Sequence, residues 1–267
     1  MNWLIRRLYC LPAAIGLAAQ AVSADAAAVT ARYDAHWGGA PVGTVVVAFA
    51  DTAQGYVNVI DIRAAGVARA LTDFSARAES AGVFDQLRGP LPRRYTATYD
   101  LRRRKGKQLA VDFVPANGAG VLAIPANAEA EARLPAALRS DVFDPLTAVL
   151  ALRQTIRAGG LVQGSRFRIP VFDGKRRFDA EGTVLGFGAA VVAGRRASTI
   201  DISILLKPVA IAKLERDDED DIAREARLQF TADGTALPLR LIVDIAYVPL
   251  IIELAETCSD LAACRTP

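Results

Sequence analysis

The sequence contains little of what enzymes and metalloproteins most often use. Its 267 residues include one histidine, three cysteines, one methionine and two tryptophans, and aromatic residues make up 7% of the chain. It has no P-loop, no dinucleotide fingerprint and no G-x-S-x-G nucleophile elbow. A hydrolase would need Ser75 or Ser80 beside His36, and a metal site would need several carboxylates around that one imidazole. We therefore expect a protein that is not an enzyme and that uses no metal or cofactor.

Runs of like charge are also few. The acidic run at 217–221 lacks the alternating ligands and central glycine of an EF-hand loop, so we interpret it as a solvated segment. The basic run lies between two strand-like segments, which predicts the tip of a hairpin. One interpretation is that its cations keep that hairpin soluble. The other is that they touch an anionic membrane surface, where each cation would contribute about 1 kcal/mol to binding. The run consists of Arg102, Arg103, Arg104, Lys105 and Lys107.

Residues 1–24 have the pattern of a secretory signal peptide. Arg6 and Arg7 precede a short apolar stretch, and Val22-Ser23-Ala24 places small residues at the cleavage positions. Arg7-Leu8-Tyr9 before Cys10 is a poor lipoprotein cleavage site. We therefore expect a periplasmic protein with residues 25–267 as its mature chain. Later apolar runs are shorter than the roughly 20 residues that span a bilayer.

The mature chain is nearly neutral. It keeps 30 basic and 29 acidic residues, so its charge gives no reason to expect a nucleic-acid partner. Its two cysteines, Cys258 and Cys264, lie close together near the C-terminus. In an oxidising compartment such a pair predicts a disulfide.

Most of the mature sequence alternates between apolar and polar residues with a period of two. Segments of seven to ten residues are separated by glycine, aspartate or proline, which predicts an antiparallel meander. Asp173-Gly174 and Asp233-Gly234 mark two hairpins after residue 160. We expect a mainly β protein in which residues 25–267 form a single domain. Its fold would be a strongly curved antiparallel sheet, an open or closed β-barrel, with one principal helix packed on or inside it.

That helix is predicted between residues 141 and 160. Asp144 is a suitable N-cap, Pro145 fits the first helical position, and Gly159 with Gly160 ends the helix. Four apolar residues fall on one face at helical spacing. They are Leu146, Val149, Leu150 and Ile156.

Arg153 falls near the centre of the same apolar face. A buried arginine is costly unless a carboxylate or backbone carbonyls pair with it. One interpretation is that the side chain extends to solvent at the rim of the face. A second is a buried Arg153 that pins the helix to the sheet through Asp141, Asp144 or Asp173, and a third is a direct role in ligand binding.

Several short motifs follow one another along the mature chain. They are Tyr33-x-x-x-Trp37, Pro41-Val42-Gly43, Pro92-x-x-Tyr95, Asp144-Pro145-Leu146 to Leu152-Arg153, Val171-Phe172-Asp173-Gly174 and Asp233-Gly234 to Leu237-Pro238. Their order resembles domain-of-unknown-function family 3108, a family of exported bacterial proteins. The resemblance implies an envelope location and a β-rich fold, and it implies no known activity. At the level of fold, the predicted sheet is similar to periplasmic lipid- or lipoprotein-binding half-barrels.

Two functions are compatible with these features. The first is a non-enzymatic envelope protein that binds a lipid or another hydrophobic ligand in a groove of the curved sheet. The alternative is a structural or scaffolding envelope factor that binds another protein through a sheet edge.

Overall fold

The structure is a computed structural model that describes residues 28–102, 104–116, 120–127, 134–192, 194–211, 224–245 and 248–265. The predicted signal peptide and the acidic run at 217–221 lie outside these residues. The strands are β1 (Val29–Trp37), β2 (Ala40–Asp51), β3 (Tyr56–Ala64), β4 (Ser75–Asp85), β5 (Gly89–Leu101), β6 (Arg104–Pro115), β7 (Val121–Pro125), β8 (Arg166–Phe172), β9 (Arg176–Val192), β10 (Arg195–Ile211), β11 (Arg224–Thr231), β12 (Pro238–Ile245) and β13 (Val248–Cys258). The helices are α1 (Gly66–Thr72), α3 (Ala136–Arg139), α4 (Pro145–Arg157) and the 3₁₀ helix η2 (Ala263–Arg265).

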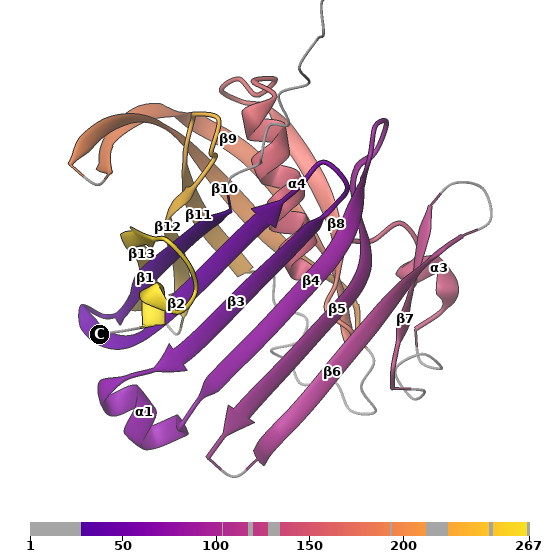
Figure 1. Cartoon of the computed structure of the whole chain (residues 1–267), viewed down its shortest axis with the longest axis horizontal. Helices are drawn as coiled ribbons and strands as arrows, with labels where there is room; N and C mark the ends of the chain where they lie inside the picture. Colours follow the sequence, from indigo (N-terminus) through magenta and orange to yellow (C-terminus); the bar gives the residue numbers. More distant parts are fainter. Residues whose placement is uncertain are drawn as a thin grey trace, which may run out of the picture.

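The described strands form one antiparallel sheet with the order β7-β6-β5-β4-β3-β2-β1-β13-β12-β11-β10-β9-β8. Each half of the chain is a meander, and the pairing of β1 with β13 joins the two halves. The first and last strands therefore lie in the middle of the sheet, while the middle of the chain lies at both of its edges (Figure 1). This arrangement confirms the prediction of a mainly β, barrel-like fold.

A short segment before α4 spans the gap between the two edge strands. The backbone N–H of Asp141 donates to the carbonyl of Val121 in β7, at 2.8 Å. Two residues later, Phe143 exchanges hydrogen bonds with β8: its N–H donates to Pro170, and its carbonyl accepts from Phe172. Because these bonds reach both edges, the segment nearly closes the sheet into a barrel without direct pairing of β7 and β8.

Helix α4 lies between the two walls of the barrel (Figure 1) and begins and ends as the sequence predicts. The Asp144 carboxylate accepts hydrogen bonds from the backbone N–H groups of Leu146 and Thr147, and Gly159 has a positive φ of 70° after the last turn. The helix buries side chains on most of its circumference, so it fills the barrel interior. Its buried residues are Leu146, Thr147, Ala148, Leu150, Leu152, Arg153 and Ile156.

Helix α1 was not predicted from the sequence. In the structure, β4 begins at Ser75. The preceding residues form a seven-residue helix that buries none of its side chains. Its apolar residues Val67 and Leu71 are exposed. The helix therefore lacks the buried apolar face whose spacing in the sequence usually predicts a helix.

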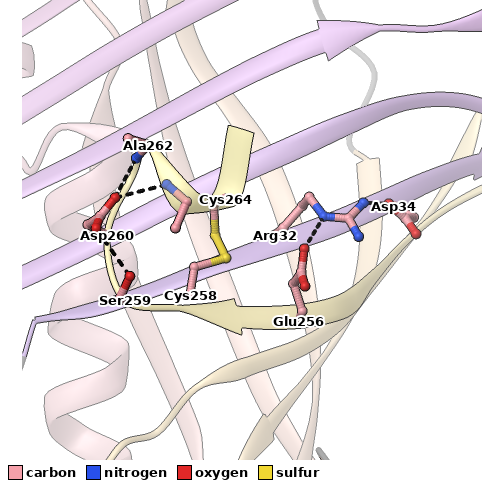
Figure 2. The surroundings of a disulfide bond; sticks show 9 residues. Arg32, Asp34, Glu256, Cys258, Ser259, Asp260, Ala262 and Cys264 are labelled. Carbon is pink, nitrogen blue, oxygen red and sulfur yellow. Dashed lines mark hydrogen bonds and ion pairs between the residues drawn. A yellow bond between two sulfur atoms is a disulfide. The ribbon is translucent and has the colours of Figure 1, made fainter. Parts of the chain in front are cut away.

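The predicted disulfide joins Cys258, at the end of β13, to Cys264 in η2 (Figure 2). The Asp260 carboxylate accepts from the N–H groups of Ala262 and Ala263 and so shapes the turn between the two cysteines. Cys264 is almost fully buried. The bond therefore holds the C-terminal turn against the central strands. Within the residues that the structure describes, no helix has the length and apolar character needed to cross a membrane.

Candidate functional site

Arg153 is the largest fully buried side chain of the described residues, with 0% exposure. Its guanidinium donates from Nε to the carbonyl of Ala236 at 3.2 Å, and from Nη2 to the carbonyl of Thr235 at 3.0 Å. Its Cζ lies 3.8 Å from the centre of the Phe49 ring, within the range of a cation–π contact. Removal from water lowers the pKa of Arg153 to about 10, so it remains a cation at neutral pH.

These contacts decide between the interpretations of Arg153. The side chain does not reach solvent, and it pins α4 to the turn between β11 and β12 through carbonyls. The expected carboxylate partners were wrong, because Asp144 caps the helix and Asp141 is exposed. Asp173 forms the β8–β9 turn, where its carboxylate accepts from the N–H groups of Lys175 and Arg176.

Arg157 reinforces the same attachment one turn later. Its guanidinium donates to the Thr235 carbonyl and forms an ion pair with Asp51 at 2.9 Å. The Thr235 turn is itself fixed by Asp233, whose carboxylate accepts from the N–H groups of Thr235 and Ala236. Helix α4 is thus bound at its C-terminal end to a turn that is 78 or more residues away in the sequence.

A second polar cluster lies at the N-terminal end of α4. Asp144 Oδ2 accepts from the hydroxyls of Thr147, at 2.5 Å, and Ser80, at 2.8 Å. The Thr147 hydroxyl is 2.8 Å from that of Tyr56. Burial raises the pKa of Asp144, and the four hydrogen bonds that the carboxylate accepts oppose this effect. The cluster therefore ties α4 to β3 and β4.

This cluster does not have the geometry of a hydrolytic site. The Ser80 hydroxyl points into the barrel interior and donates to the cap of α4. His36 is on the face of β1 that also carries Arg32 and Asp34, which is the opposite face of the sheet from buried Tyr33. Ser75 is half-buried at the start of β4. The structure does not bring these three candidates together.

Sequence reasoning did not identify Asn58, which is fully buried beside Phe49 and Ser80 in the sheet register. Within the described residues, neither polar atom of its amide has a hydrogen-bond partner, and the same holds for Nη1 of Arg153. Both side chains adjoin Phe49. Phe49 thus lies between two buried polar side chains, Asn58 and Arg153, that each keep an unpaired polar atom among the described residues.

The outer face of the barrel carries an open groove beneath the β9–β10 hairpin. This hairpin extends beyond the barrel and arches over its outer side (Figure 1, orange). One part of the groove has a volume of about 340 Å³, and an adjoining part of about 570 Å³ shares Gln229 and Arg240 with it. The hairpin provides an apolar wall of Leu185, Phe187, Ala190, Val191 and Val192.

The floor of this groove mixes apolar residues such as Ile242 and Leu239 with polar side chains that pair with one another. Gln229 donates to Asp201 at 2.8 Å, and Arg240 forms an ion pair with Glu253 at 2.7 Å. Arg227 is exposed in the same groove. The groove thus combines an apolar wall with a charged floor, as expected for a site that holds an amphiphilic molecule.

Sequence reasoning missed this groove because its floor residues follow the ordinary polar alternation of a solvated strand face. The available signal was the glycine spacing of 182–194. Of these glycines, Gly186 lines the groove. The exposed fraction of the Phe187 side chain, 54%, is the other unusual feature.

The predicted basic hairpin tip is present between β5 and β6. Leu101 pairs with Arg104 across a two-residue turn, and the described cations Arg102, Lys105 and Lys107 are exposed. Arg103 and the side chain of Arg104 lie outside the described structure. The tip lies far from the groove, at the end of the barrel that carries α1 (Figure 1).

Replacement of Arg153 should destabilise the protein in a way that depends on the new side chain. We expect Arg153→Ala to lower the free energy of unfolding by about 3 kcal/mol, because it opens a cavity and removes two hydrogen bonds. Arg153→Met should recover much of this loss, since it keeps the volume and removes a buried charge. Urea unfolding measures both, with Thr155→Ala on the exposed face of α4 as the control. Wild-type stability in Arg153→Ala would contradict the attachment.

Asp144 should give the stability a specific pH dependence. Its pKa is raised in the folded state, so its contribution is complete below the ordinary aspartate pKa and is lost as the pH rises through the raised value. Asp144→Asn keeps the shape of the cap without titrating. The stability of the wild type relative to this variant should therefore decrease as the pH rises, as measured by urea unfolding at a series of pH values. A relative stability that grows with pH would show a lowered pKa instead.

Comparisons with known proteins agree with this fold. No curated protein matches the sequence. A crystal structure from Brucella abortus, described as a beta-barrel-like protein of domain of unknown function DUF1849, is similar with a TM-score of 0.54 and 12% identity. The match covers 86% of this chain and 97% of that one, and at this identity it shows the fold alone. The model of the family described as protein of unknown function (DUF3108) matches residues 32–247. The chain therefore belongs to the DUF3108 family.

Proposed function

We propose that this protein is a non-enzymatic component of the bacterial periplasm that binds a lipid or another amphiphile beneath the β9–β10 hairpin. The observation that carries the proposal is the groove itself, with an apolar hairpin wall above a charged floor. The export pattern of residues 1–24 supports the compartment, where amphiphilic envelope components are abundant.

The groove lies on the outer face of the sheet, and not on the concave side that the sequence suggests. A curved sheet could hold a ligand on its concave side, but here α4 occupies that side. Leu150 and Phe172 are fully buried there, and Phe230 is only 1% exposed. Because the interior packs around the helix, the open space favours a ligand on the outer face.

The lining of the groove suggests how an amphiphile would lie. Phe187 and Leu185 offer exposed apolar surface for an acyl chain, together with Ile242 from β12. Burial of such surface stabilises binding by about 25 cal/mol for each Å² removed from water. Arg227 is exposed at the same place and suits an anionic headgroup, while Arg240 is already paired with Glu253.

The proposal of a non-enzymatic role rests on the positions of the candidate groups. Ser80 is occupied by the cap of α4, and His36 belongs to the other face of the sheet. In the described residues, no three histidine, cysteine, aspartate or glutamate side chains cluster in a way that suits a metal ion.

The alternative, a scaffold that pairs with another protein through a sheet edge, has less support. Val121 and Ala123 of β7 bond to Asp141 and to the buried Arg139 side chain. On β8, the bonds to Phe143 occupy the edge at Pro170 and Phe172. An added strand would have to displace these contacts.

A fluorescent amphiphile tests the groove. We expect 1-N-phenylnaphthylamine to bind the purified protein and to be displaced by phospholipid. Leu185→Ser with Phe187→Ser should weaken binding about tenfold or more, because it removes apolar contact area at exposed positions. Leu87→Ser, at a fully exposed turn residue outside the groove, is the matched control. Unchanged affinity in the groove variant, with no lipid retained in native mass spectrometry, would overturn the proposal.

A further inference from the structure

We propose that one end of the barrel docks on the surface of an anionic phospholipid bilayer. The surface, called here the α1 rim, consists of two apolar residues of α1 and four cations around them. They are Val67, Leu71, Arg69, Arg102, Lys105 and Lys107. The α1 rim is separate from the groove and would position the protein where an amphiphile is available.

The apolar part of the α1 rim is unusually exposed. Val67 is 74% exposed and Leu71 is 68% exposed, although both are large aliphatic residues. They are four residues apart in α1 and therefore lie on the same side of the helix. The helix buries none of its own side chains, so packing within the barrel does not explain these residues. Insertion into the headgroup region of a bilayer would remove both side chains from water.

The cations of the α1 rim belong to α1 and to the β5–β6 hairpin, and hydrogen bonds and an ion pair join these two elements. The N–H of Arg102 donates to the carbonyl of Thr72 at 2.7 Å, and its guanidinium reaches the carbonyl of Ala70. Lys105 forms an ion pair with Asp73 at 2.6 Å. These bonds join α1 to the β5–β6 hairpin, and both elements lie at the lower end of the barrel (Figure 1).

The charge of this face favours an anionic partner. Among the described side chains of segments 66–73 and 100–107 there are the four cations of the α1 rim and two carboxylates, Asp73 and Asp100. Both carboxylates are engaged within the rim, Asp73 with Lys105 and Asp100 with the N–H of Gly106. Positive charge therefore remains free to meet lipid phosphates, and each cation near an anionic membrane strengthens binding about fivefold.

A polar cleft beside α1 extends this surface. It has a volume of about 530 Å³ and shares Arg69, Asp73 and Lys105 with the α1 rim. Arg63 and Arg77 line it as well, and both pair with Asp61. The lining holds four cations and three carboxylates, so the cleft keeps a small excess of positive charge beside the α1 rim. The combination of exposed aliphatic residues with flanking cations suits a bilayer better than a nucleic acid, which offers no apolar medium for Val67 and Leu71.

Co-sedimentation with lipid vesicles tests this proposal. The purified chain should bind vesicles of phosphatidylcholine mixed with phosphatidylglycerol at low salt, and salt should weaken that binding. Vesicles of phosphatidylcholine alone should bind much less. Val67→Ser with Leu71→Ser should weaken binding about tenfold, and Lys107→Gln should weaken it about fivefold. The residues are exposed, so circular dichroism should show that each variant folds normally.

Two control variants make the test specific. Leu87→Ser removes a leucine that is 96% exposed in the β4–β5 turn at the other end of the barrel, and it should bind vesicles as the wild type does. The groove variant Leu185→Ser with Phe187→Ser should also keep vesicle binding. Binding that persists when the α1 rim residues are replaced, equal loss in Leu87→Ser, or no binding to anionic vesicles at low salt would each overturn the proposal.

Discussion

The attachment of Arg153 to the β11–β12 turn is the interaction on which the rest of this structure depends. A guanidinium with 0% exposure can remain in a protein interior only where carbonyls and an aromatic face replace its water. Thr235, Ala236 and Phe49 supply these partners from two different parts of the sheet. The cation therefore fixes where α4 can lie, because it would be left without partners in any other position. At the opposite end of the helix, Asp144 fixes its position by accepting hydrogen bonds from Ser80 and from the first N–H groups of α4.

The position of α4 explains how the thirteen strands of the described residues close into a barrel-like body. Each half of the chain is a simple meander with local turns, and such meanders do not by themselves bring β7 and β8 together. The residues that lead into α4 bond to both edge strands, and the helix then packs against the walls on either side. A filled interior leaves the outer face as the place where grooves can form. The long β9–β10 hairpin creates one there by arching over its neighbouring strands.

Local signals predicted much of this architecture. Asp144, Pro145 and Gly159 define the ends of α4, and Asp173-Gly174 marks a turn, because each acts through backbone groups only a few residues away. The partners of Arg153 could not be predicted, since Thr235 is 82 residues away and offers a carbonyl that every residue has. The groove was missed because alternating polar residues look alike whether a strand faces solvent or lines a site. Helix α1 was missed because its apolar residues are exposed.

Native-state hydrogen exchange, resolved by residue along α4, tests most directly whether the helix is an integral core of the barrel. If Arg153 and Asp144 hold it at both ends, the interior amides of α4 should exchange only through global unfolding. Their opening free energy should then equal that of the central strands β3 and β10. If the amides of α4 exchanged with a much smaller opening free energy while those strands stayed protected, the account would be contradicted and the helix would be a detachable lid.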